Sequence, residues 1–82
     1  MLSREEYENN FKSELDEIRH QIEKLALIHR NENRFHDLEE KEQKARLKLR
    51  ELRSSSEDSW MDIKPELERF YDDLNTAITN FH

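Results

Sequence analysis

The sequence predicts an all-α protein, an antiparallel helical hairpin or coiled coil with one long and one shorter helix. Apolar residues recur at alternating steps of three and four along most of the chain, which is the spacing of helices packed against one another. The 82 residues include no glycine and one proline, and 41% are charged. This composition is typical of long helices with a narrow apolar stripe.

The first helix is predicted to span about 3–53. It begins with Ser3-Arg4-Glu5-Glu6, the pattern of a capping box in which the serine hydroxyl accepts a hydrogen bond from the amide three residues later. Two apolar stripes follow within this segment. The first stripe consists of Phe11, Leu15, Ile18, Ile22 and Leu25, and the second of Phe35, Leu38, Ala45, Leu49 and Leu52.

The two stripes are out of phase, and the slip falls within residues 29–35, HRNENRF. Asparagine tolerates the left-handed conformation that ends many helices, so Asn31 or Asn33 could support a chain reversal. The lack of glycine favours a continuous helix with a local irregularity in its repeat. The alternative is a break near 30–34, which would give a three-helix bundle.

A corner is predicted at 54–57, within the segment RSSSED. Serine disfavours helix interiors and suits helix ends, because its hydroxyl hydrogen-bonds nearby backbone groups. Ser54 and Glu57 have the spacing of a second capping box. The helix that follows is predicted over about 57–81, so the chain forms a single helical domain over 1–82.

Pro65 lies within this last helix. Proline cannot donate a hydrogen bond to the carbonyl of Met61, and its ring crowds that group. Either the helix kinks at Pro65, or 57–63 forms a separate turn and Pro65 takes the first position of the main helix. We expect Trp60 to anchor the corner by packing against Leu49 or Leu52.

The residue types present disfavour an enzyme and a cofactor. Without cysteine there is no thiol nucleophile, and without glycine there is no glycine-rich phosphate loop. The basic segment 41–53 has no aromatic residues and lies between acidic segments, so we expect no nucleic-acid partner. The longest apolar run, LALI at 25–28, is too short to cross a membrane. With no signal-peptide pattern at the start, a cytoplasmic location is expected.

A metal site is an alternative hypothesis. His29 and His36 lie seven residues apart, with Glu32 between them. Imidazole and carboxylate groups are common zinc ligands, so these three side chains on one helical face could bind a metal ion. The other interpretation is a polar patch at the slip between the stripes.

Three segments carry a family resemblance: YENNFKSELDEIRHQIEKL, then ARLKLRELRSSSEDSWMDIKPELERFYDDL, then AITNF. They resemble small bacterial coiled-coil proteins that are labelled as stress-associated. The corner, LRSSSEDSW followed by DIK, is the most specific part. The resemblance implies a helical architecture and no known active site, and it supplies no function.

In a hairpin, the second helix covers only the back half of the first, and the first stripe stays exposed. An exposed stripe of this length indicates an interface. We therefore expect a homo-oligomer or a helical protein partner. The predicted function is a non-enzymatic structural or interaction module that acts through coiled-coil contacts. The alternative is reversible amphipathic binding to a lipid or membrane surface through the same stripe. The residues assigned to the structural core or interface are Leu15, Ile18, Ile22, Leu25, Trp60 and Phe70.

Overall fold

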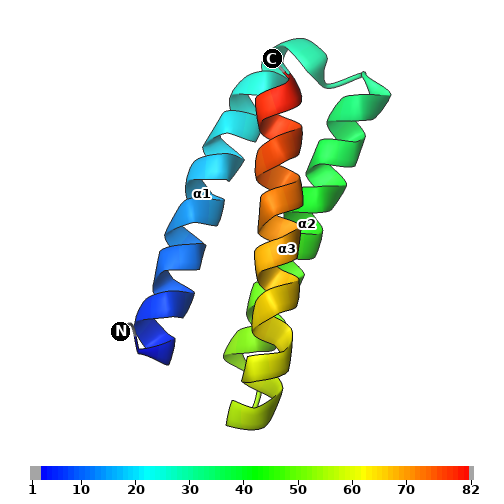
Figure 1. The fold of residues 1–82 in the computed structure, drawn as a ribbon. Coiled ribbons are helices and arrows are strands. Elements are labelled where there is room, and N and C mark those ends of the chain that lie inside the picture. Colours follow the sequence, from blue (N-terminus) through cyan, green and yellow to red (C-terminus); the bar gives the residue numbers. More distant parts are fainter. Residues whose placement is uncertain (1–2, 82) are drawn as a thin grey trace.

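The protein is a bundle of three helices (Figure 1). The computed structural model describes residues 3–81, with α1 at Arg4–His29, α2 at Asn33–Arg53 and α3 at Glu57–Phe81. α1 and α3 run in the same direction and α2 runs antiparallel to both. The predicted continuous helix over 3–53 is wrong, because the chain reverses between α1 and α2. The three-helix alternative is the observed architecture.

The start of α1 is capped as the sequence predicts. Ser3 has an extended backbone, and its hydroxyl accepts a hydrogen bond from the Glu6 amide at 3.2 Å. The Ser3 carbonyl accepts from the Tyr7 amide at 3.0 Å. Glu5 and Glu6 lie in the first turn, where negative charge is favoured by the partial positive charge of the helix N-terminus.

The reversal between α1 and α2 uses ordinary backbone conformations. Arg30 keeps helical angles (φ −51°, ψ −34°), and Glu32 is extended (φ −88°, ψ 138°). The Glu32 amide donates to the His29 carbonyl at 2.9 Å. No residue from 3 to 81 has a positive φ, so the left-handed asparagine cap considered from the sequence is not used.

The phase slip explains why the chain turns here. The heptad of α1 would place its next contacts at His29, Glu32 and His36, but the second stripe begins at Phe35, one residue early. One residue corresponds to about 100° around a helix. A continuous helix would therefore direct its two stripes toward different sides, whereas the reversal directs both into one core.

The three serines of the corner form hydrogen bonds with the end of α2 and the start of α3. Ser54 Oγ donates to the Arg50 carbonyl at 3.1 Å, and Ser55 Oγ donates to the Leu52 carbonyl at 2.6 Å. Ser56 Oγ accepts from the Ser59 amide at 3.3 Å. Ser54 and Ser55 thus satisfy carbonyls at the end of α2, and Ser56 caps the start of α3. The predicted Ser54–Glu57 capping box is wrong, because the capping hydroxyl lies two residues later.

Pro65 lies inside α3, which is continuous from Glu57 to Phe81. The alternative in which 57–63 forms a separate turn is therefore wrong. The bounds of α3 coincide with the predicted helix over about 57–81.

The core is formed by the apolar stripes of all three helices. The α1 stripe, which the hairpin would leave exposed, is covered by α2 and α3. Four of its five members are buried, with exposed fractions of 0% for Leu15, 4% for Ile18, 7% for Ile22 and 8% for Leu25, and Phe11 is partly buried. The predicted interface rested on the exposure of this stripe. The stripe lies inside the molecule, so that argument no longer applies.

α2 lies at the centre of the packing, since its backbone approaches both neighbours, whereas α1 and α3 approach each other least. Aromatic rings span the wider gap between α1 and α3. We call these contacts the aromatic seam. Ring centroids are 5.4 Å apart in the pair Tyr7–Trp60, 5.4 Å in Phe11–Tyr71 and 4.9 Å in His29–Phe81.

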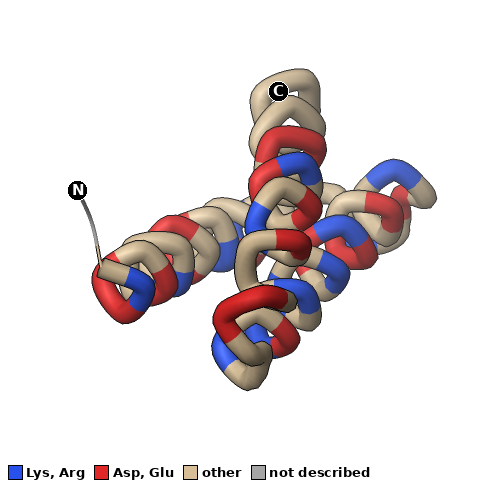
Figure 2. Tube along the Cα trace, turned by 60° about the horizontal axis from the view of Figure 1, so that its bottom comes forward, with Lys and Arg blue, Asp and Glu red and all other residues tan. Residues whose placement is uncertain are grey.

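Acidic and basic residues are interspersed along the helices (Figure 2). The basic segment 41–53 of α2 pairs with α3 at Lys48, whose Nζ lies 2.9 Å from Glu66 Oε2. The hydrogen bonds to Glu66 and Glu51 raise the pKa of Lys48. Exposed pairs of this kind contribute about 0–1 kcal/mol each, so they fix the orientation of the helices more than they stabilise them.

Candidate functional site

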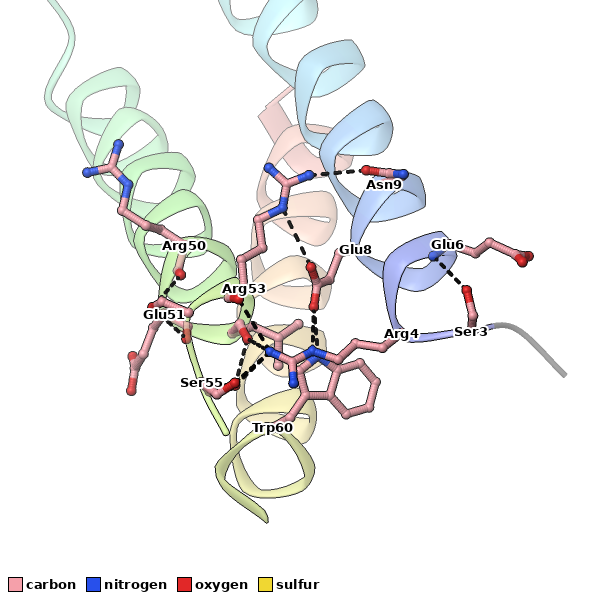
Figure 3. A network of polar contacts seen from close by, with 12 residues as sticks. Ser3, Arg4, Glu6, Glu8, Asn9, Arg50, Glu51, Arg53, Ser55 and Trp60 are labelled. Atoms are coloured by element: carbon pink, nitrogen blue, oxygen red, sulfur yellow. Dashed lines mark hydrogen bonds and ion pairs between the residues drawn. The ribbon is translucent and has the colours of Figure 1, made fainter. Parts of the chain in front are cut away.

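A polar network surrounds Glu8 where the start of α1 meets the corner between α2 and α3 (Figure 3). Glu8 is 9% exposed. Its Oε2 accepts from Trp60 Nε1 at 3.0 Å and from Arg4 Nε at 3.0 Å, and its Oε1 lies 3.7 Å from Arg53 Nε. A buried carboxylate needs such partners, because burial without them is strongly unfavourable. Glu8 thereby connects all three helices.

Arg4 caps the end of α2 from a different helix. Its Nη2 donates to the Leu52 carbonyl at 3.0 Å and to the Ser55 carbonyl at 2.7 Å. Carbonyl groups at a helix C-terminus lack intrahelical partners and carry partial negative charge. A guanidinium group suits this position, and it ties the N-terminal turn of α1 to the corner.

Trp60 contacts α1, and this corrects the expected role of its side chain. We expected packing against Leu49 or Leu52, but the indole donates to Glu8, and its ring meets Tyr7 edge-on. The side chain is partly buried. The expectation assumed a hairpin, in which no third helix would lie beside the corner.

Sequence reasoning missed Glu8, although a signal exists. Glu8 lies seven residues before Leu15, at a core position of the α1 heptad. Glu42 likewise lies seven residues after Phe35 and is 8% exposed. An acidic residue at a core heptad position predicts a buried, paired carboxylate.

Arg46 makes a second polar link, between α2 and α1. It donates to Glu42, to Asp16 Oδ1 at 3.1 Å and to the Leu15 carbonyl at 3.2 Å. Burial disfavours the Arg46 cation, but its hydrogen bonds to Glu42 and Asp16 outweigh that effect and raise its pKa. The hydrogen bond from Arg46 lowers the pKa of Asp16.

Two tyrosines of the aromatic seam are held in the neutral form. The Tyr7 hydroxyl donates to Glu68 Oε2 at 2.7 Å, and burial, followed by this hydrogen bond, raises the pKa of Tyr7 well above its ordinary value. Burial also raises the pKa of Tyr71, with a further contribution from the carboxylates of Glu14 and Glu17.

The three candidate metal ligands do not converge. His29 Nδ1 hydrogen-bonds Glu32, whereas His36 Nδ1 lies 3.4 Å from Glu39 Oε1. Glu32 also accepts from Arg34 Nε at 2.8 Å, and the hydrogen bonds from His29 and Arg34 lower its pKa. In the described part of the chain, no group of three or more His, Asp or Glu side chains could hold a metal ion. Glu32 instead bridges the two sides of the turn between α1 and α2.

The residues expected to form an interface contact other parts of the same chain. Leu15, Ile18, Ile22 and Leu25 lie in the core, and Phe70 is partly buried, with Lys48 Nζ 5.8 Å from its ring centroid.

Two adjacent large apolar side chains are exposed at the end of α1. Leu27 is 83% exposed and Ile28 is 78% exposed. By contrast, Met61 on α3 and Leu47 on α2 are single exposed apolar residues, with exposed fractions of 64% and 61%. We call Leu27 and Ile28 the exposed pair. Sequence reasoning noted their run only for its length, because LALI is apolar on every side of the helix.

No protein-family model, curated protein or solved structure matches the chain. None of the three helices, over the residues described, has the length and apolar character needed to cross a bilayer.

Proposed function

We propose that the protein is a non-enzymatic helical interaction module, which associates with a second copy of itself through helix–helix contacts at the exposed pair. The observation that carries the proposal is the exposure of Leu27 and Ile28, at 83% and 78%. Single exposed apolar residues are common on protein surfaces. Two large neighbours at the end of α1, in a bundle that buries its apolar stripes, are a candidate contact surface.

The surroundings of the exposed pair support this proposal. Lys24 and Arg30 lie three residues to either side of Leu27, and both are exposed. Residues three apart are neighbours on a helix surface, so a polar rim flanks the apolar pair. An apolar centre with a polar rim is the usual anatomy of a protein interface. The Glu8 network and the aromatic seam hold α1 on the bundle and so fix the position of this surface.

The lipid-binding alternative would require a conformational change of the three-helix bundle. The stripe on which that hypothesis rested, including Ile18 and Ile22, lies in the core. Binding a membrane surface through it would require the bundle to open. The exposed pair by itself is a small apolar surface, and amphipathic membrane binding scales with the apolar area buried.

The proposal is tested by sedimentation equilibrium over a concentration series. We expect the parent to self-associate, and L27E/I28E to weaken the association about a hundredfold or more, since burying each side chain contributes about 1.5–3 kcal/mol. L47E/M61E is the matched control, because it places the same two charges on exposed apolar residues of the other two helices.

Three outcomes would contradict the proposal. The first is a parent that is monomeric at every concentration. The second is an L27E/I28E variant that associates like the parent. The third is co-flotation with phosphatidylcholine–phosphatidylglycerol vesicles that is lost in L27E/I28E, which would favour the lipid alternative.

A further inference from the structure

The turn between α1 and α2 is close to a helix in conformation. Arg30 already has helical angles, and Glu32 has the extended backbone that redirects the chain. The turn contains no glycine or proline, and no described residue has a positive φ. Arginine, asparagine and glutamate can all adopt the helical conformation at a small cost. The residue types at 30–32 are therefore compatible with a continuous helix that joins α1 and α2.

Opening this turn would expose surfaces that fit each other. α1 would carry away its apolar stripe, together with Arg4, Tyr7 and Glu8. The rest of the chain would expose the α2 carbonyls that bind Arg4, the Trp60 indole that binds Glu8, and the Glu68 carboxylate that binds Tyr7. A second copy of the chain offers the same groups in the same arrangement. Exchange of an identical element conserves the contacts outside the hinge and is a low-cost route to dimers.

We propose that two copies of this chain associate by exchanging α1, which requires residues 30–32 to straighten into a helix. This inference rests on the proposed function and specifies how the two copies associate. In the dimer each α1 packs on α2 and α3 of the other copy. The one-residue offset between the stripes is harmless there, because the two halves of each joined helix face different bundles.

The exposed pair acquires a role in this dimer. α1 and α2 are antiparallel in the closed bundle (Figure 1), so the two joined helices run antiparallel and their hinges lie side by side. Leu27 and Ile28 are within about one helical turn of residues 30–32. Exchange brings the exposed pairs of both copies to this crossing, where they bury apolar area that the monomer leaves in water.

The balance between the two states depends on concentration. In the monomer, Glu32 links His29 and Arg34 across the turn, and Arg34 lies 4.3 Å from the Phe81 ring centroid. These contacts favour the closed turn. The dimer gains the new contact at the exposed pair and a continuous helix, so it accumulates as the protein concentration rises.

Chain exchange is tested by mixing two single-cysteine variants. The natural sequence has no cysteine, so Asn9→Cys and Arg53→Cys each provide the sole thiol of their chain. Arg53 Nη2 hydrogen-bonds Asn9 Oδ1 at 3.1 Å in the closed bundle. After the variants are refolded together at high concentration, we expect a short bismaleimide to link two chains across this contact. The control mixture pairs Asn9→Cys with Leu47→Cys, whose thiol faces outward on α2, and should give little inter-chain product.

A hinge variant provides the second measurement. Asn33 is the first residue of α2, a position that favours proline, and Glu32 already has the extended conformation that a residue before proline prefers. Asn33→Pro should therefore fold as the closed monomer. Inside a joined helix it would be strongly unfavourable, and each dimer contains two joined helices, so the dimerisation constant should fall about ten-thousandfold, equivalent to about 5.5 kcal/mol.

The outcomes separate this inference from the proposed function. Inter-chain linkage that Asn33→Pro abolishes supports exchange at residues 30–32. A dimer by light scattering without inter-chain linkage overturns exchange and leaves the interaction module standing. Linkage that Asn33→Pro does not reduce overturns the assigned hinge. A monomer at every concentration, with no linkage, overturns both proposals.

Discussion

Glu8 occupies a core position that an apolar residue would ordinarily fill. Its carboxylate is satisfied by donors from the other two helices as well as from α1, because Trp60 belongs to α3 and Arg53 to α2. Leucine at this position would bury well but would leave the Trp60 N–H without its acceptor and would remove one partner from each of Arg4 and Arg53. An unsatisfied buried donor costs about 1–3 kcal/mol. The polar core position therefore specifies which three helix ends meet.

Substitutions of Trp60 separate its hydrogen bond from its packing. Trp60→Phe keeps a ring against Tyr7 but removes the donor to Glu8, and should cost about 1–2 kcal/mol. Trp60→Ala also removes the ring and should cost about 3 kcal/mol, toward the lower end of the range for buried aromatics because the side chain is only partly buried. Urea unfolding followed by circular dichroism measures both.

Met61→Ala is the control for these variants. Met61 is the next residue along α3 and is 64% exposed, so its truncation should change the free energy of unfolding by less than about 0.5 kcal/mol. A Trp60→Ala protein that unfolds at the same urea concentration as the parent would show that the indole does not hold α1 to the corner.

At the level of the elements, α3 contains a proline in its interior. Pro65 is exposed and lies within a continuous helix, so the Met61 carbonyl receives no hydrogen bond from it. Pro65→Ala restores that donor and should stabilise the protein by about 1–3 kcal/mol. For a chain of this size, each kcal/mol raises the melting temperature by about 4–8 °C, which thermal unfolding followed by circular dichroism detects.

Pro65→Gly is the matched comparison, since it restores the same donor in a residue of lower helix propensity. It should recover about 1 kcal/mol less than Pro65→Ala. If both variants melt like the parent, the helix accommodates the missing hydrogen bond without cost, and Pro65 is not a weak point of α3.

The elements that the sequence predicted correctly are those with explicit local signals. α3 has a regular stripe and a serine-rich start, and Ser3 marks the start of α1 with a hydroxyl cap. The reversal at 30–32 has no such signal, because one extended glutamate redirects the chain without glycine or a left-handed residue. The information was present only in the phase of the two stripes. A one-residue slip is compatible with both an irregular helix and a turn, and the packing of the third helix decides between them.

The candidate site was less predictable than the fold. Leu25 to Ile28 are all apolar, so the pattern does not say which of these side chains face the core. The bundle buries Leu25 at 8% exposed and leaves Leu27 at 83%. Which residues of such a run remain free depends on where the neighbouring helices lie, and that is a tertiary property.

For the whole molecule, stability should fall at alkaline pH through the aromatic seam. Tyr7 and Tyr71 both have a pKa above the ordinary tyrosine value of 10.0, and burial is the main cause for each. The folded state therefore favours the neutral phenol, and the unfolded chain ionises first. The stabilising effect is complete below about pH 10. It is lost as the pH rises through the raised pKa values that the two tyrosines have in the folded state.

The measurement is urea unfolding across a pH series, with tyrosinate followed by ultraviolet absorbance. Tyr7→Phe should flatten the decrease in stability above pH 10, because it removes one of the two raised groups. If tyrosinate forms in the folded protein with the ordinary tyrosine pKa of 10.0, this account of the seam is contradicted.

An odd number of helices also has a mechanical consequence. Ser3 and Phe81 lie toward opposite ends of a bundle that measures 41 × 18 × 18 Å (Figure 1). Tension between these ends would pull α1 and α3 in opposite directions along their axes. The Glu8 network at one end and the His29–Phe81 contact at the other would then be loaded in shear, together rather than one after another. A hairpin, with both ends on one side, would instead peel apart contact by contact, so the third helix makes this fold a stiffer spacer.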